Sequence, residues 1–352
     1  MSKAIKLGIS IGDINGVGLE VILKSFKDKR MLDFCTPILY GDYQLALNTK
    51  KLLGLEDVFL NRIASVKDSK PNKVNVLNCW KETAEPNYGT KNESGGKYAL
   101  KSLEKASQAL KNGEIDALLT APINKDNIQS DSFKFPGHTE YLEQKFDGKA
   151  LMLMLCDKLR IGLVTGHLPI DQISKNITQE LIIQKLKSFN KSLQQDFGIR
   201  KPKIAVLGLN PHAGDNGLLG EEEAKTIIPA LQKAENQGLL SFGPYSADGF
   251  FGSNSWKAFD GILAMYHDQG LIPFKTLSFG NGVNFTSGLS VIRTSPDHGT
   301  AFDIAGQNKA SETSFIQAIY TACDVFKKRQ EWRTIHSNTL QSQPPTDKTR
   351  ER

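Results

Sequence analysis

Short apolar runs alternate with longer amphipathic stretches along most of the chain. The apolar runs have the length of buried strands, and they cover residues 5–12, 37–41, 116–122, 151–156, 160–167, 203–210, 261–268 and 289–295. Between them, residues 94–113 and 178–198 repeat apolar side chains at helical spacing, and Gly198 closes the second stretch. This alternation predicts an α/β fold with a largely parallel sheet covered by helices on both faces.

Several predicted strands end in polar motifs rich in Gly and Pro. These motifs read "GDINGVG", "TAPINK", "TGHLP", "LNPHAG", "YHDQG" and "RTSPDHGTA". In open α/β sheets the carboxyl ends of the strands line the crevice where ligands bind. The motifs come from distant parts of the chain, so we expect them to form one shared site.

Composition narrows the class of protein. The 352 residues are 39% hydrophobic and 23% charged, as in ordinary soluble proteins. We find no window of about 20 apolar residues that could span a bilayer, and no signal-peptide pattern at the N-terminus. The four cysteines are scattered without paired spacing. We therefore expect a cytoplasmic protein with no membrane partner and no disulfide framework.

The net charge of +6 is concentrated near the C-terminus. Residues 327–352 hold seven basic and three acidic side chains, so they carry four of the six surplus charges. This segment is polar and lacks hydrophobic periodicity, which predicts a disordered basic tail. Because the rest of the chain is nearly neutral, we expect no nucleic-acid partner.

Histidines are unusually placed. Five of the six lie in polar motifs rather than inside a predicted element, namely His138, His167, His212, His267 and His298. Three of these, His167, His212 and His267, each follow a predicted strand directly. Three imidazoles at one sheet edge could bind a divalent metal and leave positions open for substrate. The alternative is a set of histidines that only form hydrogen bonds with their neighbours.

Residues that could bind an anion follow His267 closely. They are Lys275, Asn284 and Arg293, in a region otherwise rich in Gly and apolar side chains. Lysine supplies a point charge, and the planar guanidinium of arginine suits phosphate or carboxylate. Ordinary surface cations are the alternative, but Arg293 lies in a predicted buried strand, where an unpaired charge is costly.

The segment "GDINGVGLE" follows the first predicted strand and opens a helix. Its glycines are spaced G-x3-G-x-G, which does not fit the G-x-G-x-x-G fingerprint of dinucleotide-binding folds. A tight backbone turn at a helix N-terminus is the simpler interpretation.

The motifs, taken in order, resemble the 4-hydroxythreonine-4-phosphate dehydrogenase family of pyridoxal phosphate biosynthesis. The resemblance rests on "GDINGVGLE", "TAPINK", "GHTEYL", "TGHLP", "NPHAGDNGLLGEEE", "YHDQGLIPFK" and "GVNFTSGLSVIRTSPDHGTAFDIAG", and it covers about residues 5 to 325. The chain departs from the family pattern at Ile14 and Leu19, where prolines are usual, and at Gly166 and Gly249, where threonines are usual.

A more distant similarity extends to the isocitrate and isopropylmalate dehydrogenases. In those enzymes a loop similar to "DHGTAFDIAG" holds the adenosine part of NAD. The resemblance implies two α/β/α domains flanking a cleft within one catalytic unit, residues 1–326. The subdomains would be about 1–130 plus 270–326, and 131–269. It also implies a homodimer with a shared active site.

The resemblance assigns roles to individual residues. It implies that His167, His212 and His267 bind one divalent ion (Zn, Mg, Mn or Co), with His267 reaching the site of the partner subunit. The implied substrate contacts are His138, Thr139, Lys275, Asn284 and Arg293, and the implied NAD contacts are His298, Gly299, Thr300, Ala301 and Asp303. Lys275 and Asp248 are the candidate catalytic side chains, and a metal-bound water is a third candidate for the base.

The implied reaction is the oxidation by NAD of the C3 hydroxyl of 4-phosphooxy-L-threonine. Decarboxylation of the resulting β-keto acid would give 3-amino-2-oxopropyl phosphate. Three alternatives stay open. They are a paralogue acting on 4-phospho-D-threonate or 4-phospho-D-erythronate, a metal-dependent phosphate-ester hydrolase, and a non-enzymatic anion-binding protein. A hydrolase would have no use for the "DHGTAFDIAG" loop.

Overall fold

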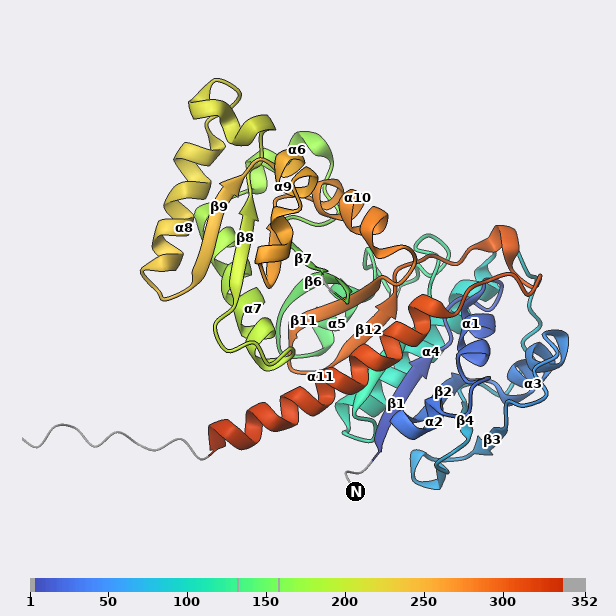
Figure 1. Ribbon diagram of the computed structural model, residues 1–352. Helices are drawn as coiled ribbons and strands as arrows, with labels where there is room; N and C mark the ends of the chain where they lie inside the picture. The colour runs from blue at the N-terminus through green and yellow to red at the C-terminus, as the bar shows by residue number, and fades with distance from the viewer. Residues whose placement is uncertain (1–3, 132, 158, 338–352) are drawn as a thin grey trace, which may run out of the picture.

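The computed structural model describes residues 4–131, 133–157 and 159–337, and its α/β architecture confirms the predicted fold class (Figure 1). The strands are β1 Ile5–Ser10, β2 Cys35–Gly41, β3 Leu60–Ile63, β4 Val74–Asn78, β5 Ala117–Thr120, β6 Gly148–Cys156, β7 Leu159–Leu163, β8 Lys203–Leu207, β9 Leu240–Tyr245, β10 Gly261–Ala264, β11 Val283–Leu289 and β12 Arg293–Pro296. The α-helices are α1 Gly18–Ser25, α2 Met31–Phe34, α3 Tyr43–Leu52, α4 Glu93–Lys111, α5 His138–Lys145, α6 Ile170–Asn176, α7 Gln179–Gln195, α8 Ile228–Glu235, α9 Ala247–Gly252, α10 His267–Ser278 and α11 Thr313–Ser337.

All the named strands belong to one sheet with the order β3-β4-β2-β1-β5-β12-β11-β6-β7-β10-β8-β9. The strands from β3 to β12 are mutually parallel, and so are those from β7 to β9. Between these two sections the β12/β11, β11/β6 and β6/β7 pairs are antiparallel. The predicted division into two subdomains stays a prediction, since the sheet continues through it.

The antiparallel centre changes where a site can form. Three antiparallel steps reverse the strand direction, so the carboxyl ends of the two parallel sections point to opposite edges of the sheet. The motifs that follow four of these strands still line one cavity, because the residues after β5 and β12 lie there together with His167 after β7 and His267 after β10. His212, which follows β8, lines a different cavity.

The predicted strand over residues 289–295 is also wrong in its bounds. Strand β11 ends at Leu289 and β12 begins at Arg293, and the two form an antiparallel hairpin. Residues 283–288, which the apolar pattern missed, are the larger part of β11. Polar side chains interrupt this segment: Asn284 lines a cavity, and the buried Thr286 accepts a hydrogen bond from Arg293.

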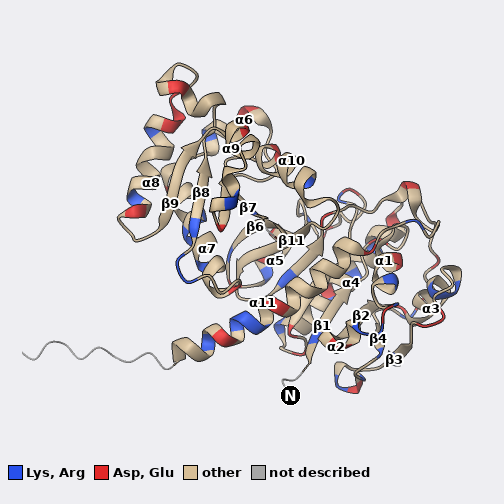
Figure 2. Cartoon of the chain, in the orientation of Figure 1, with Lys and Arg blue, Asp and Glu red and all other residues tan. Residues whose placement is uncertain are grey.

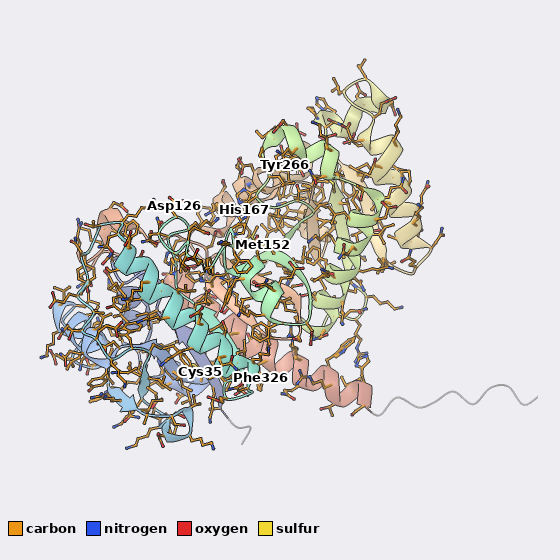
Figure 3. The ribbon with its side chains drawn as sticks, turned by 180° about the vertical axis from the view of Figure 1, so that it is seen from behind. Cys35, Asp126, Met152, His167, Tyr266 and Phe326 are labelled. Carbon is orange, nitrogen blue, oxygen red and sulfur yellow. The ribbon has the colours of Figure 1, made fainter. Side chains whose placement is uncertain are left out.

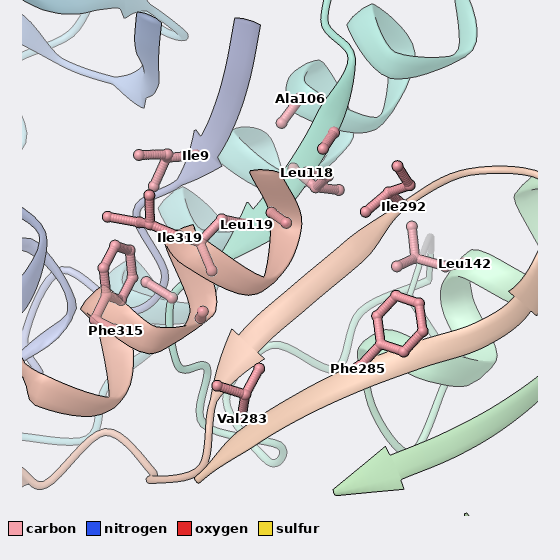
Figure 4. Packing of buried hydrophobic residues seen from close by; sticks show 14 of the residues in the cluster. Ile9, Ala106, Leu118, Leu119, Leu142, Val283, Phe285, Ile292, Phe315 and Ile319 are labelled. Atoms are coloured by element: carbon pink, nitrogen blue, oxygen red, sulfur yellow. The ribbon is translucent and has the colours of Figure 1, made fainter. Parts of the chain in front are cut away.

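Opposite faces of the central strands have different surroundings. Leu151, Leu153 and Leu155 of β6 are buried, and helices α7 and α11 pack against this central part of the sheet. Figure 4 shows Phe315 and Ile319 of α11 packed beside the strands near Ile9 and Leu119. Because successive strand residues point to opposite faces, the residues between these leucines are directed away from that core.

Part of the predicted tail is helical. Helix α11 continues to Ser337, so residues 327–337 are not disordered, whereas residues 338–352 lie outside the described part of the chain. Arg329, counted above as a tail charge, is 4% exposed and donates from Nε to Asp196 Oδ1 at 2.7 Å. Asp196 also accepts from Ser192, and a second Arg329 nitrogen lies 3.3 Å from the Ser290 carbonyl. The helix extends because this buried ion pair attaches it to α7.

Replacing Arg329 with Met should lower the free energy of unfolding by about 3 kcal/mol, because Asp196 would stay buried without its partner. Urea denaturation measures this effect. The neighbouring Lys328 pairs with Glu331 at the surface, so Lys328→Met is the matched control, with an expected change below about 0.5 kcal/mol. Equal stability of the two variants would show that the buried pair does not hold α11. Figure 2 shows the surface charges along this end of the helix.

Candidate active site

A cavity of about 320 Å³ lies on one face of the central strands β6, β11 and β12. Met152 and Met154 of β6 line it, and they alternate with the leucines that face the core. The walls come from the loop after β5, the N-terminus of α5, and α10. Figure 3 labels Met152 and His167, which both line the cavity, in the middle of the molecule.

Most of the residues predicted for the site meet here. The cavity is lined by His138, Thr139, His167, His267, Lys275, Asn284, Arg293, His298 and Gly299. His212 and Asp248 line a different cavity, and Ala301 lines a third. One chain therefore brings together the predicted substrate contacts and two of the three predicted metal ligands.

Arg293 is a buried cation with no carboxylate partner among the described residues. Its side chain is 2% exposed and donates to the hydroxyl groups of Thr120 and Thr286 at 2.7–3.1 Å. Burial lowers the pKa of the Arg293 guanidinium to about 9, so it is still charged at neutral pH. An uncompensated buried charge is costly, and an anion bound in the cavity would offset that cost.

Three buried polar atoms around the cavity lack hydrogen-bond partners among the described residues. They are His138 Nε2, Asn284 Oδ1 and His298 Nε2. Burial lowers the pKa of His138 well below its usual value, and the positive charge of Arg293 adds to the shift. Buried polar atoms are rarely left unpaired, so these three indicate a polar ligand.

His167 and His267 lie side by side, with ring centroids 5.4 Å apart. Burial lowers the pKa of His167, with a further contribution from Lys125, which favours the neutral imidazole that metals bind. His267 Nδ1 lies 2.7 Å from Asp268 Oδ1, a contact that orients the ring and leaves Nε2 available. Two imidazoles that share a tetrahedral ion have centroids about 5 Å apart, given metal–nitrogen distances of about 2.1 Å. The pair therefore fits a metal.

His212 lies on the other side of α10. It lines a cavity of about 680 Å³ together with Asp248 and Asp268. Residues 212–216 all have positive φ, between 43° and 84°, which is a rare left-handed turn for non-glycine residues. Such strain persists where the surroundings enforce it, often at functional sites. Glu223 supports this turn by accepting from the backbone N–H groups of Leu209 and Asn210.

No group of three metal-ligating side chains forms within the described residues of one chain. The three-histidine site predicted from the sequence is thus not closed by a single subunit. The three histidines nevertheless have the right chemistry to bind a divalent ion. The imidazoles of His167 and His267 are neighbours, and His212 follows β8, the strand next to β10.

The two candidate catalytic side chains also lie in different cavities. Lys275 lies in the small cavity, where its Nζ is 3.2 Å from Asp297 Oδ1. Burial raises the pKa of Asp297, and Lys275 partly opposes this. A hydrogen bond from Ser246 lowers the pKa of Asp248, which weakens it as a base.

The predicted cofactor loop borders a third cavity, of about 560 Å³. This cavity shares Lys275, Asp297 and His298 with the small cavity, so the two are contiguous. The loop is held by the glycine-rich turn, because Val17 N donates to Thr300 O at 3.0 Å. A Cβ on Gly16 would lie 2.7 Å from that same carbonyl, so only glycine fits there.

Two charged residues of the small cavity were missed by the sequence analysis. Lys125 Nζ lies 3.4 Å from His167 Nε2, and Glu140 Oε1 lies 4.0 Å from His167 Nδ1. Both belong to motifs that the sequence analysis quoted, "TAPINK" and "GHTEYL". Their place in these motifs was the only hint in the sequence, and it does not distinguish a residue of the site from an ordinary surface charge.

Comparisons with known proteins identify the family. Residues 33–322 match the family model described as "Pyridoxal phosphate biosynthetic protein PdxA". The 4-hydroxythreonine-4-phosphate dehydrogenase of Bacteroides thetaiotaomicron is 50% identical, over 96% of this chain and 93% of its own. Solved structures of enzymes with that name give TM-scores of 0.76 (Burkholderia phymatum, 35% identity, 92% of this chain and 99% of that one) and 0.79 (Klebsiella pneumoniae, 31%, 92% and 98%).

None of the described helices is long and apolar enough to cross a membrane. The family resemblance inferred from the motifs is confirmed, and its members in the comparisons match over nearly their whole length. The chain belongs to the PdxA family of pyridoxal phosphate biosynthetic proteins.

Proposed function

We propose that this chain is an NAD-dependent dehydrogenase that oxidises 4-phosphooxy-L-threonine at its C3 hydroxyl. The β-keto acid so formed loses carbon dioxide to give 3-amino-2-oxopropyl phosphate, a step of pyridoxal phosphate biosynthesis. The observation that carries the proposal is Arg293, a buried cation without a carboxylate partner among the described residues, at a cavity sized for a small metabolite. Its relatives named 4-hydroxythreonine-4-phosphate dehydrogenase support the same assignment.

The residues of the cavity divide the work of substrate binding. Arg293 holds an anionic group of the substrate, Lys275 lines the same cavity, and the unpaired atoms of His138, Asn284 and His298 complete the hydrogen bonds of the substrate. Charged hydrogen bonds fix the orientation as well as the affinity, and orientation is what hydride transfer needs. Of the two candidate bases, Lys275 lines this cavity and Asp248 does not, which favours Lys275.

His167 and His267 would hold a divalent metal, and His212 of a second copy of the chain would supply the third imidazole. A divalent ion held by these imidazoles would supply Lewis-acid chemistry at the oxygen of the substrate. The proposal of a homodimer follows from the placement of His212 across α10, away from the other two histidines. It differs from the sequence-based assignment of His267 to the partner's site, because His267 lies beside His167 in the same chain.

NAD would occupy the 560 Å³ cavity, with the nicotinamide at the end shared with the substrate cavity. His298 and Asp297 lie at that shared end, Ala301 and Ile304 line the larger cavity, and Gly299 lines the small one. The space beside Gly299 is open, since a Cβ there would meet no atom within 4 Å. A cytoplasmic location stays a prediction from the sequence.

The proposed substrate is tested by comparing three compounds. NADH formation is followed with 4-phosphooxy-L-threonine, 4-phospho-D-threonate and 4-phospho-D-erythronate at equal concentration. We expect the first to give the highest kcat/KM. A preference for either of the other two would assign the chain to the paralogous activity instead, and phosphate release without NADH would indicate a hydrolase.

Lys125 should contribute to binding of the anionic substrate, because it faces the cavity and has no ion pair among the described residues. Lys125→Met should raise KM about tenfold and change kcat by less than about threefold, since the side chain is largely exposed. Steady-state kinetics at saturating NAD measure both. The exposed Lys134 does not line the cavity, so Lys134→Met is the control. Equal KM values for the two variants would remove Lys125 from the site.

A further inference from the structure

Lys275, the favoured base, needs a partner that can take a proton from it. Lysine side chains are ammonium ions at neutral pH, and an ammonium has no lone pair with which to accept a second proton. Lys275 can therefore take the proton of the C3 hydroxyl only if it gives one of its own away. The group that receives this proton has to lie within hydrogen-bond distance of Nζ.

Asp297 is the carboxylate beside Lys275. Its Oδ1 lies 3.2 Å from Lys275 Nζ, and its side chain is 14% exposed. The backbone N–H of Asp297 donates to the hydroxyl of Ser314 at 2.9 Å, and a Cβ on Gly282 would lie 2.8 Å from Asp297 Oδ2. These contacts with the start of α11 and with the residue before β11 fix the carboxylate in place.

Asp297 also lies where the reaction has to occur. Of the two carboxylates among the described residues that line the substrate cavity, Glu140 and Asp297, only Asp297 also lines the proposed cofactor cavity. Lys275 lines both cavities as well. Hydride transfer requires the C3 carbon beside the nicotinamide, so the hydroxyl on that carbon lies at the shared end. Asp297 is thus the carboxylate that can serve a base at this end.

The surroundings of Asp297 make it a better proton acceptor than an ordinary aspartate. Burial raises its pKa, and the positive charge of Lys275 partly opposes this rise. His298, the next residue, and His267 of α10 are the other titratable groups that act on it, and both favour the ionised carboxylate. A carboxylate with a raised pKa binds a proton more readily during turnover.

We propose that Asp297 is the final proton acceptor of a relay through Lys275. Lys275 Nζ passes a proton to Asp297 and takes the proton of the C3 hydroxyl, while the hydrogen on C3 leaves with its electron pair for NAD. The products are the C3 ketone, NADH and a protonated Asp297, and Lys275 keeps its charge. When the C1–C2 bond breaks, carbon dioxide leaves and the same proton returns to C2, which restores both residues.

The inference rests on the proposed function and adds Asp297 to it as a positioning residue, because Asp297 acts through Lys275. The test uses Asp297→Asn in the full chain, since asparagine keeps the shape but cannot accept a proton. Its kcat at pH 7 should be about 10²-fold lower than that of the parent, with KM within about threefold. Lys275 must then be neutral before the reaction, so kcat should rise about tenfold per pH unit from pH 7 to 9. The kcat of the parent should change less than about threefold over this range.

A second variant replaces the lost carboxylate from solution. Asp297→Ala should gain at least about tenfold in kcat at pH 7 when formate is added, because a small carboxylate can take the place of the side chain. Asp28→Asn is the matched control, since Asp28 pairs with Arg30 at the surface and lines none of the cavities described above. Its pH profile should match that of the parent.

The outcomes separate the relay from the proposed function. A pH profile of Asp297→Asn that runs parallel to that of the parent would overturn the inference. No gain with formate in a folded Asp297→Ala, with the fold measured by circular dichroism, would overturn it too. A parent protein that forms no NADH with 4-phosphooxy-L-threonine at any pH would instead overturn the proposed function.

Discussion

Replacing Arg293 with Met should lower kcat/KM for the phosphorylated substrate by about 10²–10³-fold, chiefly through KM. The guanidinium is buried against Thr120 and Thr286, and no carboxylate among the described residues lies within ion-pair distance of it. Glu140 favours its charged form from farther away. An anionic group of the substrate would supply that missing charge. Methionine keeps most of the side-chain volume but cannot bind an anion. The change in KM, measured by steady-state kinetics, therefore reports the loss of the positive charge.

The stability of the same variant separates binding from folding. Burying an unpaired guanidinium is unfavourable, so Arg293→Met should unfold at the same temperature as the parent or a higher one. Arg160 is the matched control, because burial also lowers its pKa while it packs against Phe197, outside the substrate cavity. Arg160→Met should leave KM unchanged. A KM for Arg293→Met within threefold of the parent would remove Arg293 from the site.

Replacing His212 with Ala should reduce metal-dependent turnover by at least about 10³-fold while the fold stays intact. His212 lies in a different cavity from His167 and His267 of the same chain. It would therefore bind the metal that these two residues hold in a second copy of the chain. The measurements are kcat with added divalent metal, bound metal by mass spectrometry, and circular dichroism for the fold.

Mixing two inactive variants tests the shared site directly. If His167 and His212 of different subunits act together, a heterodimer of His167→Ala and His212→Ala chains keeps one intact site. Random reassociation should then restore about a quarter of the parent activity. An inactive mixture that contains heterodimers would place both histidines in the site of one subunit. Full metal-dependent activity of His212→Ala alone would contradict the assignment of this residue as a ligand.

The sequence predicts the fold class and most of the site because local patterns carry both. The apolar runs and helical stretches identify the strands and helices, and Arg293 stands out as a charge in a buried segment. The hairpin at residues 283–296 was not predictable, since Asn284, which lines the cavity, and the buried Thr286 and Ser287 break the apolar run. The reversal of strand direction is a long-range property that no local window contains.

The division of the histidines between two cavities is likewise set by tertiary structure. Three histidines after three strands look equivalent in the sequence, yet α10 separates His212 from the other two. Arg329 shows the same limit, because a basic segment looks like a tail until Asp196, 133 residues earlier, is found beside it. Lys125 was visible only as part of a motif, and its contact with His167 depends on how the loop after β5 folds.

The central claim is metal-dependent oxidative decarboxylation by NAD, and one assay tests it most directly. NADH and carbon dioxide are measured together with 4-phosphooxy-L-threonine, before EDTA, after EDTA, and after a divalent metal is restored. We expect equal amounts of the two products, loss of both with EDTA, and recovery of both with metal. Undiminished NADH formation in EDTA, or NADH without carbon dioxide, would contradict the account.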